Sequence, residues 1–268
     1  MDAPRGTSRP LDGSYRPIDG SYRPLDGSCR PLDGWEMAGF GVGRGRRLPW
    51  VTVLVLAIDT ATPTLVVGVA VLDDDGLRVL VDRHVPTARG HAELLSSLVL
   101  DCLTEAGVAR ADLRAVVVGT GPGPFTGLRV GMASAVAFAD ALGIDVVGVC
   151  SLDAVVHGVP DAAHGDALVV TDARRREVYW ARYVDTVRTD GPSVNAPSDI
   201  ADRIDSPTTV LGSPDHAALL GLTARPDSAA PTVAGLVAAA AQQLRSGQHD
   251  PVVPLYLRRP DAVERARP

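Results

Sequence analysis

The chain has 268 residues, 46% of them hydrophobic, and a formal net charge of −6. It is long enough for one or two domains that each bury a sizeable core. All 26 basic residues are arginine, and the absence of lysine excludes a P-loop lysine, a Schiff base and a lysine general base.

The charge is unevenly distributed along the chain. Residues 1–50 hold eight arginines and six acidic residues, so the remainder holds 18 against 26 and carries a net charge of −8. Such an acidic body is poorly suited to binding nucleic acid on its own, because phosphate contacts need a positive surface. We therefore expect any role in RNA metabolism to be exercised through partners, with the RNA bound indirectly.

The cysteines and the apolar runs indicate a cytoplasmic protein. Cys29, Cys102 and Cys150 show neither disulfide nor zinc spacing, as is typical of a reduced compartment. The longest uncharged runs, such as residues 115–128, are too short and too interrupted by glycine and proline to span a membrane. The start of the chain lacks the pattern of a secretory signal. We expect no membrane partner.

Residues 9–35 repeat a seven-residue unit of the form RPLDGSY. Each unit has one leucine or isoleucine among turn-forming residues, which is too little apolar surface to offset the entropy of ordering. The proline in every unit excludes a coiled-coil heptad. We interpret residues 1–50 as a disordered leader, possible alternatives being a short interaction tail or upstream DNA translated from a mis-set start. The folded part is predicted to begin at Val51 or Val53.

From residue 53 onward the pattern predicts an α/β fold. Strands are expected at 53–58, 64–72 and 77–84, with a tight turn at 73–76. A helix at 90–107, a strand at 114–118, a helix at 125–142, a strand at 145–149 and a helix from Ser151 complete the unit. This order is that of one ribonuclease-H-like lobe, and we assign it to residues 51–160.

Residues 161–258 are predicted to form a second lobe. The expected elements are strands at 167–171, 177–184 and about 209–211, a helix at 232–245 and an extended segment at 254–258. The pattern lacks a clear second set of three crossover helices, so we expect this lobe to be reduced. Residues 259–268 are predicted to be a flexible tail.

A glycine-rich turn, residues 119–131 (GTGPGPFTGLRVG), connects a predicted strand to a predicted helix. Backbone N–H groups at such a place, together with the positive end of the helix, can bind an anion. Pro122 and Pro124 have no N–H to donate, which makes the turn rigid and poor in donors. The turn is either a phosphate loop that uses Gly121 and Gly123, or a structural element.

Asp59, Thr60 and Thr62 follow the first predicted strand. An aspartate at this place can face a nucleotide or a metal, and the hydroxyls can contact phosphates. The alternative is a turn in which these side chains bind neighbouring backbone groups. With the glycine-rich turn they define a candidate nucleotide site, Asp59, Thr60, Thr62, Gly121 and Gly123, for which both interpretations stay open.

The pattern predicts neither a metal site nor a catalytic nucleophile. The histidines considered are His84, His91, His157 and His164. A helical ligand pair needs a spacing of about four residues, but Leu95 stands four residues after His91. Ser134 and Cys150 have no histidine beside them in a triad pattern, although a triad assembled in space stays open.

Small residues recur every four positions in the predicted helix 125–142, namely Gly127, Gly131, Ala135 and Ala139. Such a smooth ridge allows another helix to approach closely. The preceding predicted helix has its own apolar stripe, which includes Leu94 and Leu98. Two interpretations stay open: packing against the chain's own sheet or first helix, or an interface for a helical partner formed by these six residues.

One basic cluster, Arg174, Arg175 and Arg176, lies on the predicted turn between two strands of the second lobe. It could contact an RNA phosphate or an acidic partner, or it could be a solvated turn.

Five motifs, in order and spacing, resemble the bacterial TsaB (YeaZ) family. They are residues 57–62 (AIDTAT), 119–131, 148–152 (GVCSL), 172–174 (DAR) with 177–180 (EVYW), and 254–258 (PLYLR). The resemblance covers roughly residues 53–258, and the leader has no counterpart. It implies the two-lobed fold of the actin/hsp70/sugar-kinase superfamily.

The resemblance also implies a role in making N6-threonylcarbamoyladenosine at position 37 of ANN-decoding tRNAs. In that family TsaB is not the catalyst, but pairs through the helices of its first lobe with TsaD, which holds the metal and transfers the threonylcarbamoyl group. TsaE, an ATPase, joins the assembly. By analogy, helices 90–107 and 125–142 would form the interface, and a homodimer through the same helices stays open. No cofactor is implied, apart from a possible nucleotide at the subunit junction.

One departure from the family pattern weakens nucleotide binding. Pro124 stands where the family usually has serine, which removes a hydroxyl and an N–H from the loop. The alternative functions are an actin-like small-molecule kinase that uses Asp59 and the glycine loop, and a metallopeptidase, for which the sequence shows neither metal ligands nor a nucleophile.

Overall fold

The computed structural model describes residues 52–86, 91–159, 165–201, 204 and 209–258. Contacts divide the chain into one unit at Met1–Arg47 and another at Leu48–Pro268, and every described helix and strand belongs to the second. The predicted leader, His164 and the predicted tail all lie outside the described residues.

Five strands of the second unit form the larger sheet, in the order β3-β2-β1-β4-β5. β1 (Val53–Asp59), β2 (Thr64–Asp73) and β3 (Gly76–Pro86) are antiparallel neighbours, whereas β4 (Ala115–Gly119) runs parallel to β1 and β5 (Asp145–Val149) parallel to β4. This topology confirms the predicted ribonuclease-H-like lobe. It also brings the carboxyl ends of β1, β4 and β5 to one edge of the sheet.

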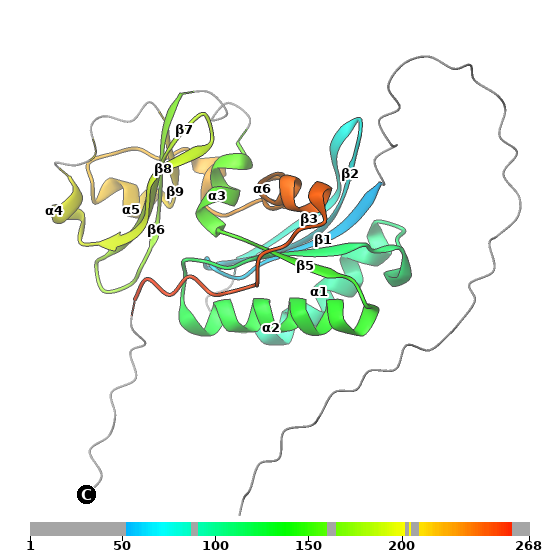
Figure 1. The fold of residues 1–268 in the computed structure, drawn as a ribbon. Coiled ribbons are helices and arrows are strands. Elements are labelled where there is room, and N and C mark those ends of the chain that lie inside the picture. Colours follow the sequence, from blue (N-terminus) through cyan, green and yellow to red (C-terminus); the bar gives the residue numbers. More distant parts are fainter. Residues whose placement is uncertain (1–51, 87–90, 160–164, 202–203, 205–208, 259–268) are drawn as a thin grey trace, which may run out of the picture. The chain divides into compact units, whose positions relative to one another are not determined.

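Helices cover both faces of this sheet, namely α1 (His91–Glu105), α2 (Phe125–Leu142) and α6 (Val233–Ser246). A further helix, α3 (Ser151–His157), packs against α6 and the smaller sheet. Successive side chains of β1 point to opposite faces. Leu56 and Ile58 therefore share one core cluster with residues of α1 and α2, whereas Val55 and Ala57 share another with residues of α6. In Figure 1 α1 and α2 lie below the sheet and α6 above it.

The position of α6 differs from the predicted division into lobes. We assigned residues 161–258 to the second lobe, but Leu236 and Val237 of α6 are buried against the first sheet. Backbone N–H of Val233 also donates to the Asp82 carboxylate of β3 at 3.2 Å. The chain thus returns to the first sheet after completing the second one.

The smaller sheet has four strands in the order β8-β7-β6-β9. The strands are β6 (Asp166–Asp172), β7 (Val178–Val184), β8 (Val187–Asn195) and β9 (Thr209–Gly212). Short helices, α4 (Pro197–Ile200) and α5 (Pro214–Ala218), and the 3-10 turns η1 (Arg110–Asp112) and η3 (Pro226–Ser228) complete the fold. The lobe built on this sheet is reduced, as predicted.

β8 was not predicted, because its sequence is polar and contains Gly191 and Pro192. It pairs only with β7 and forms the edge of the smaller sheet. Proline has no N–H for a central ladder but is tolerated at an edge, where polar side chains also face water. The edge position therefore explains a strand that lacks the usual apolar alternation.

Among the described residues, α2 alone is long and apolar enough to cross a membrane by length and composition. Ala135 and Ala139 of this helix are fully buried in a core cluster against the chain's own sheet. α2 is therefore accounted for as a core helix of the folded unit.

Candidate functional site

The Asp59 carboxylate lies at the carboxyl end of β1 and is completely buried. One carboxylate oxygen, Oδ2, accepts a hydrogen bond from Ser151 Oγ at 2.5 Å. The other, Oδ1, accepts from the backbone N–H of Ala61 at 2.8 Å. Both oxygens are thus satisfied inside the chain, which is what a buried carboxylate requires.

Ser151 connects this carboxylate to the glycine-rich turn. Ser151 Oγ accepts from the Gly121 N–H at 3.2 Å, and the Ser151 N–H donates to the Gly121 carbonyl at 2.7 Å. Because Ser151 begins α3, these bonds join the ends of β1 and β4 to the first turn of α3. We call this arrangement, formed by Asp59, Ser151 and Gly121, the Asp59 cluster.

The neighbouring threonines also bind backbone groups of the chain. Thr60 Oγ1 donates to the Gly127 carbonyl in the first turn of α2 at 2.8 Å. Thr62 Oγ1 donates to the Thr64 carbonyl at 3.1 Å and accepts from the Thr64 N–H at 3.2 Å. The Thr62 contacts match the turn interpretation, in which the side chain binds neighbouring backbone groups. Thr60 instead binds a carbonyl 67 residues away and so fixes the start of α2 to the end of β1.

The glycines of the turn allow a close approach of other groups. A Cβ at Gly119 would lie 1.7 Å from Asp59 Oδ2, and one at Gly131 would lie 2.1 Å from Thr60 Oγ1. One at Gly123 would lie 2.2 Å from the Ala61 carbonyl oxygen. The glycine pattern is therefore explained by packing around Asp59 and Thr60.

Burial raises the pKa of Asp59 to about 6, although the hydrogen bonds from Ser151 and Ala61 lower it. Desolvation disfavours the charged form, whereas donors to the carboxylate favour it. A kinase would need this carboxylate to face the nucleotide or its metal. With the side chain sealed from solvent, the geometry does not support the kinase alternative.

His164 and the side chain of His91 lie outside what the structure describes, and the other residues considered for catalysis gain no support as a reactive site. Within the described part of the chain, no three histidine, cysteine, aspartate or glutamate side chains form a possible metal site. His84 pairs with Asp82 of β3 at 2.8 Å, and this hydrogen bond raises the His84 pKa. Burial raises the pKa of the Cys150 thiol to about 12, which keeps it in the unreactive protonated form. The metallopeptidase alternative thus gains no support.

The small-residue stripe is not available to a partner, and this part of the predicted interface is wrong. Gly127, Gly131, Ala135 and Ala139 are all buried on the inner side of α2. Gly131 lies against Thr60, whereas Ala135 and Ala139 belong to the core cluster shared with α1 and the sheet. The stripe therefore allows α2 to pack closely on its own sheet.

The outer sides of the same two helices expose large apolar residues instead. Leu94 and Leu100 of α1 and Val136 of α2 are exposed, with 48% of Leu100 accessible. Leu98, which we predicted with Leu94, is half-buried beside the core. A groove of about 160 Å³ lies nearby, lined by Ile58, Leu95, Ser96, Val99, Leu100, Ser134 and Phe138. We call Leu94, Leu100, Val136 and this groove the outer helix face.

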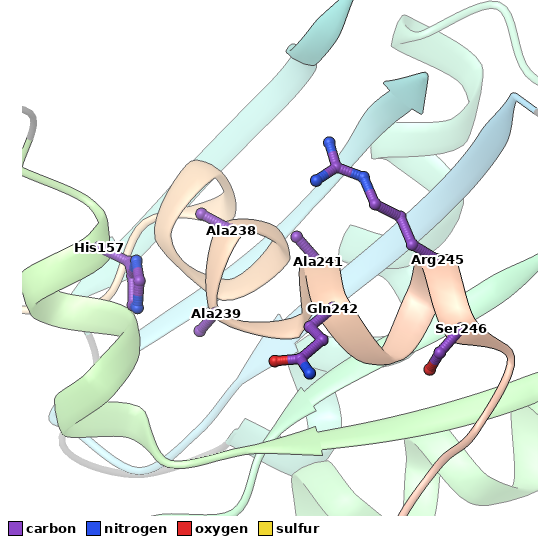
Figure 2. Close-up of a pocket in the computed structure, with 7 residues that line it drawn as sticks. All are labelled: His157, Ala238, Ala239, Ala241, Gln242, Arg245 and Ser246. Atoms are coloured by element: carbon purple, nitrogen blue, oxygen red, sulfur yellow. The ribbon is translucent and has the colours of Figure 1, made fainter. Parts of the chain in front are cut away.

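A second hollow, of about 590 Å³, lies between α3 and α6. Figure 2 shows that His157 comes from α3, while the other labelled side chains come from α6, mainly alanines with Gln242, Arg245 and Ser246. Burial lowers the pKa of His157, which favours its neutral form. No local pattern predicts this hollow, because its lining depends on the return of α6 to the first sheet.

Ser151 was missed as a partner of Asp59. It lies two residues after the end of β5, and β5 lies beside β4 in the sheet. Polar residues after neighbouring parallel strands meet at the same sheet edge. The predicted strand order therefore indicates that Ser151 lies near Asp59. A local pattern does not show this contact, because the two residues are 92 positions apart in the sequence.

Comparisons with known proteins agree with this architecture. Residues 85–249 match the family model described as TsaD, tRNA N6-adenosine threonylcarbamoyltransferase. An uncharacterized protein of Mycobacterium tuberculosis (strain ATCC 25618 / H37Rv) is 55% identical over 208 residues, which are 78% of this chain and 93% of the relative.

Two further relatives have more informative names. The tRNA threonylcarbamoyladenosine biosynthesis protein TsaB of Escherichia coli (strain K12) is 36% identical over 131 residues, covering 48% of this chain and 54% of the relative. The solved structure of YeaZ from Pseudomonas aeruginosa superposes with a TM-score of 0.63 at 27% identity, covering 76% of this chain and 100% of that chain.

Proposed function

Because the chain belongs to the TsaB (YeaZ) family, we propose that it is a non-catalytic subunit of the assembly that makes N6-threonylcarbamoyladenosine at position 37 of tRNA. Its role there is to bind and stabilise a TsaD-like catalytic subunit. A TsaE-like ATPase is the further protein partner, and the cytoplasm is the place of action.

The outer helix face is the observation that carries this proposal. Isolated surface leucines need no explanation, but here Leu94, Leu100 and Val136 are exposed on adjacent helices beside an apolar groove. Large apolar side chains exposed near an apolar groove are typical of protein–protein interfaces. Two neighbouring helices also offer the ridges and grooves into which helices of a related subunit can pack.

The Asp59 cluster supports the non-catalytic part of the proposal. A carboxylate that acted on a ligand would have to face it, whereas Asp59 is enclosed by Ser151 and the glycine-rich turn. The chain therefore contributes surface, and the reacting groups are supplied by the partner.

The test is co-purification of the full chain with its TsaD-like partner, followed by measurement of the modified nucleoside in tRNA. Leu100→Glu places an unpaired carboxylate in the apolar interface, so we expect pairing to weaken by about a hundredfold or more. Modification by the reconstituted assembly should fall with it.

Leu219→Glu provides the matched control, because Leu219 is 55% exposed and lies outside the helices of the interface. This variant should pair and support modification like the unsubstituted chain. If Leu100→Glu pairs normally, or if both variants lose pairing equally, the assignment of the interface is wrong. A homodimer through the same face would be weakened by Leu100→Glu as well, and the mass of the complex distinguishes it from the heterodimer.

A further inference from the structure

We propose that the chain contacts RNA directly, through an exposed surface at the start of α2, the C-terminal segment and the turn between β6 and β7. This inference rests on the proposed function and adds a second contact to it. The surface, which we call the arginine–aromatic surface, is formed by Phe125, Arg129, Arg174, Arg175, Arg176 and Tyr256.

The C-terminal segment holds the parts of this surface together. The Leu255 N–H donates to the Thr120 carbonyl at 2.9 Å, and Arg258 Nη1 donates to the Ala173 carbonyl at 2.8 Å. Leu255 and Leu257 pack against a core cluster of the smaller sheet. In Figure 1 the segment can be followed from α6 past the first turn of α2. Tyr256 is thus held between the glycine-rich turn and the β6–β7 turn.

The aromatic part of the surface is a compact stack. The rings of Phe125 and Tyr256 have centroids 4.9 Å apart. The Arg129 guanidinium lies 3.8 Å above the Phe125 ring, and its Nε donates to the Tyr256 hydroxyl at 2.9 Å. Tyr256 remains 40% exposed. Exposed rings and guanidinium planes are the groups on which unpaired RNA bases stack.

The turn between β6 and β7 carries three exposed arginines whose backbone φ angles are positive. Arg174, Arg175 and Arg176 have φ angles of 64°, 50° and 64°. Three successive non-glycine residues in the left-handed region are disfavoured, so the turn needs support. The Arg174 N–H donates to Asp172 Oδ1 at 2.6 Å, and the Glu177 N–H donates to the Arg174 carbonyl at 2.9 Å.

The local charge is opposite to that of the whole chain. Two of the arginines here are paired, Arg174 with Asp172 at 3.4 Å and Arg258 with Glu177 at 3.2 Å. Across the described residues, Arg129 and Arg176 have no carboxylate partner. A positive surplus on a chain of net charge −6 favours a polyanion.

RNA fits this surface better than an acidic protein does. An acidic peptide would satisfy the arginines but would leave the Phe125–Tyr256 stack without a matching group, whereas RNA brings phosphates and bases together. Arg129 and Val136 are seven residues apart on α2, which is about 10 Å along the axis. RNA and the protein partner can therefore be bound at neighbouring places on the same helix.

The test measures binding of an unmodified tRNA transcript to the complex of the full chain with its TsaD-like partner, over a series of salt concentrations. Arg176→Glu should weaken binding about tenfold and reduce the salt dependence by about one unit of slope. Arg176→Lys keeps the charge and should bind nearly normally. Arg78→Glu, the same change at an exposed position of β3, is the matched control and should have little effect.

Each contrary result has a different meaning. If the complex forms and Arg176→Glu and Arg129→Gln both bind the transcript normally, the arginine–aromatic surface does not contact RNA and the proposed function stands. If these variants bind RNA normally but lose the TsaE-like ATPase, the surface docks a protein and the RNA proposal is overturned. If the unsubstituted chain fails to pair with its partner, the proposed function itself is wrong.

Discussion

The Asp59 cluster and the outer helix face belong to the same lobe, yet they differ in which groups are exposed to solvent. Around Asp59, polar groups that look catalytic in the sequence are enclosed and satisfied by one another. On the outer sides of α1 and α2, leucine and valine side chains face solvent. Buried polar groups with partners are explained by folding, whereas exposed apolar groups at neighbouring positions indicate a partner.

The largest effect on folding is expected from Gly119→Ala. The added Cβ would meet Asp59 Oδ2 at 1.7 Å, and both atoms belong to parts that the cluster holds in place. We expect a loss of about 3 kcal/mol or more of unfolding free energy, because the clash also disturbs a buried hydrogen-bond network. Urea denaturation measures this loss. A change below about 1 kcal/mol would mean that the cluster is loosely packed.

A smaller effect is expected from the ionisation of Asp59. Its pKa is raised from 3.8 to about 6, so the folded chain holds a proton that the unfolded chain has already released between these values. The Asp59 contribution to the unfolding free energy should therefore fall by roughly 3 kcal/mol at most as the pH rises from about 4 to about 6. Above about pH 6 this contribution should not change further. This contribution is greatest at low pH, unlike that of an aspartate in a salt bridge.

Asp59→Asn isolates this contribution, because asparagine has nearly the same shape and no charge to titrate. The difference in unfolding free energy between the two chains should change over this pH range. If the two curves of unfolding free energy against pH run parallel, Asp59 is not desolvated as described.

The two sides of α2 can be compared with a matched pair of substitutions. Ala135→Leu inserts a large side chain into a closed core position and should cost about 2 kcal/mol. Ala133→Leu makes the same change at an exposed position of the same helix and should alter stability by only about 0.5 kcal/mol or less. Thermal or urea unfolding of both variants checks this. Equal losses would contradict the assignment of inner and outer sides.

Much of the fold could be predicted because local signals marked the ends of its elements. α2 has the bounds that the sequence predicts, because Pro124 precedes the helix and Gly143 follows it. In the structure Gly143 ends the helix in the left-handed conformation, with a φ of 65°. β8 was not predicted, because an edge strand does not need the apolar alternation from which strands are recognised. α6 was recognised as a helix, but its return to the first sheet depends on distant contacts that a local pattern does not contain.

The candidate site was harder to predict for a physical reason. Asp59 and the glycine-rich turn are compatible both with a ligand site and with a closed turn, and only the contact with Ser151 distinguishes them. In α2, small residues recur at helical spacing whichever side they face. Their burial against Thr60 and α1 was decided by the packing of the whole lobe.

The proposed function requires the outer helix face and does not require a carboxylate at Asp59. The most direct test is the yield of N6-threonylcarbamoyladenosine in tRNA after reconstitution with Asp59→Asn and with Leu100→Glu. We expect Asp59→Asn to support nearly the full yield and Leu100→Glu to support almost none. The proposed function is wrong if Asp59→Asn pairs with the partner but gives no product, or if Leu100→Glu gives the full yield.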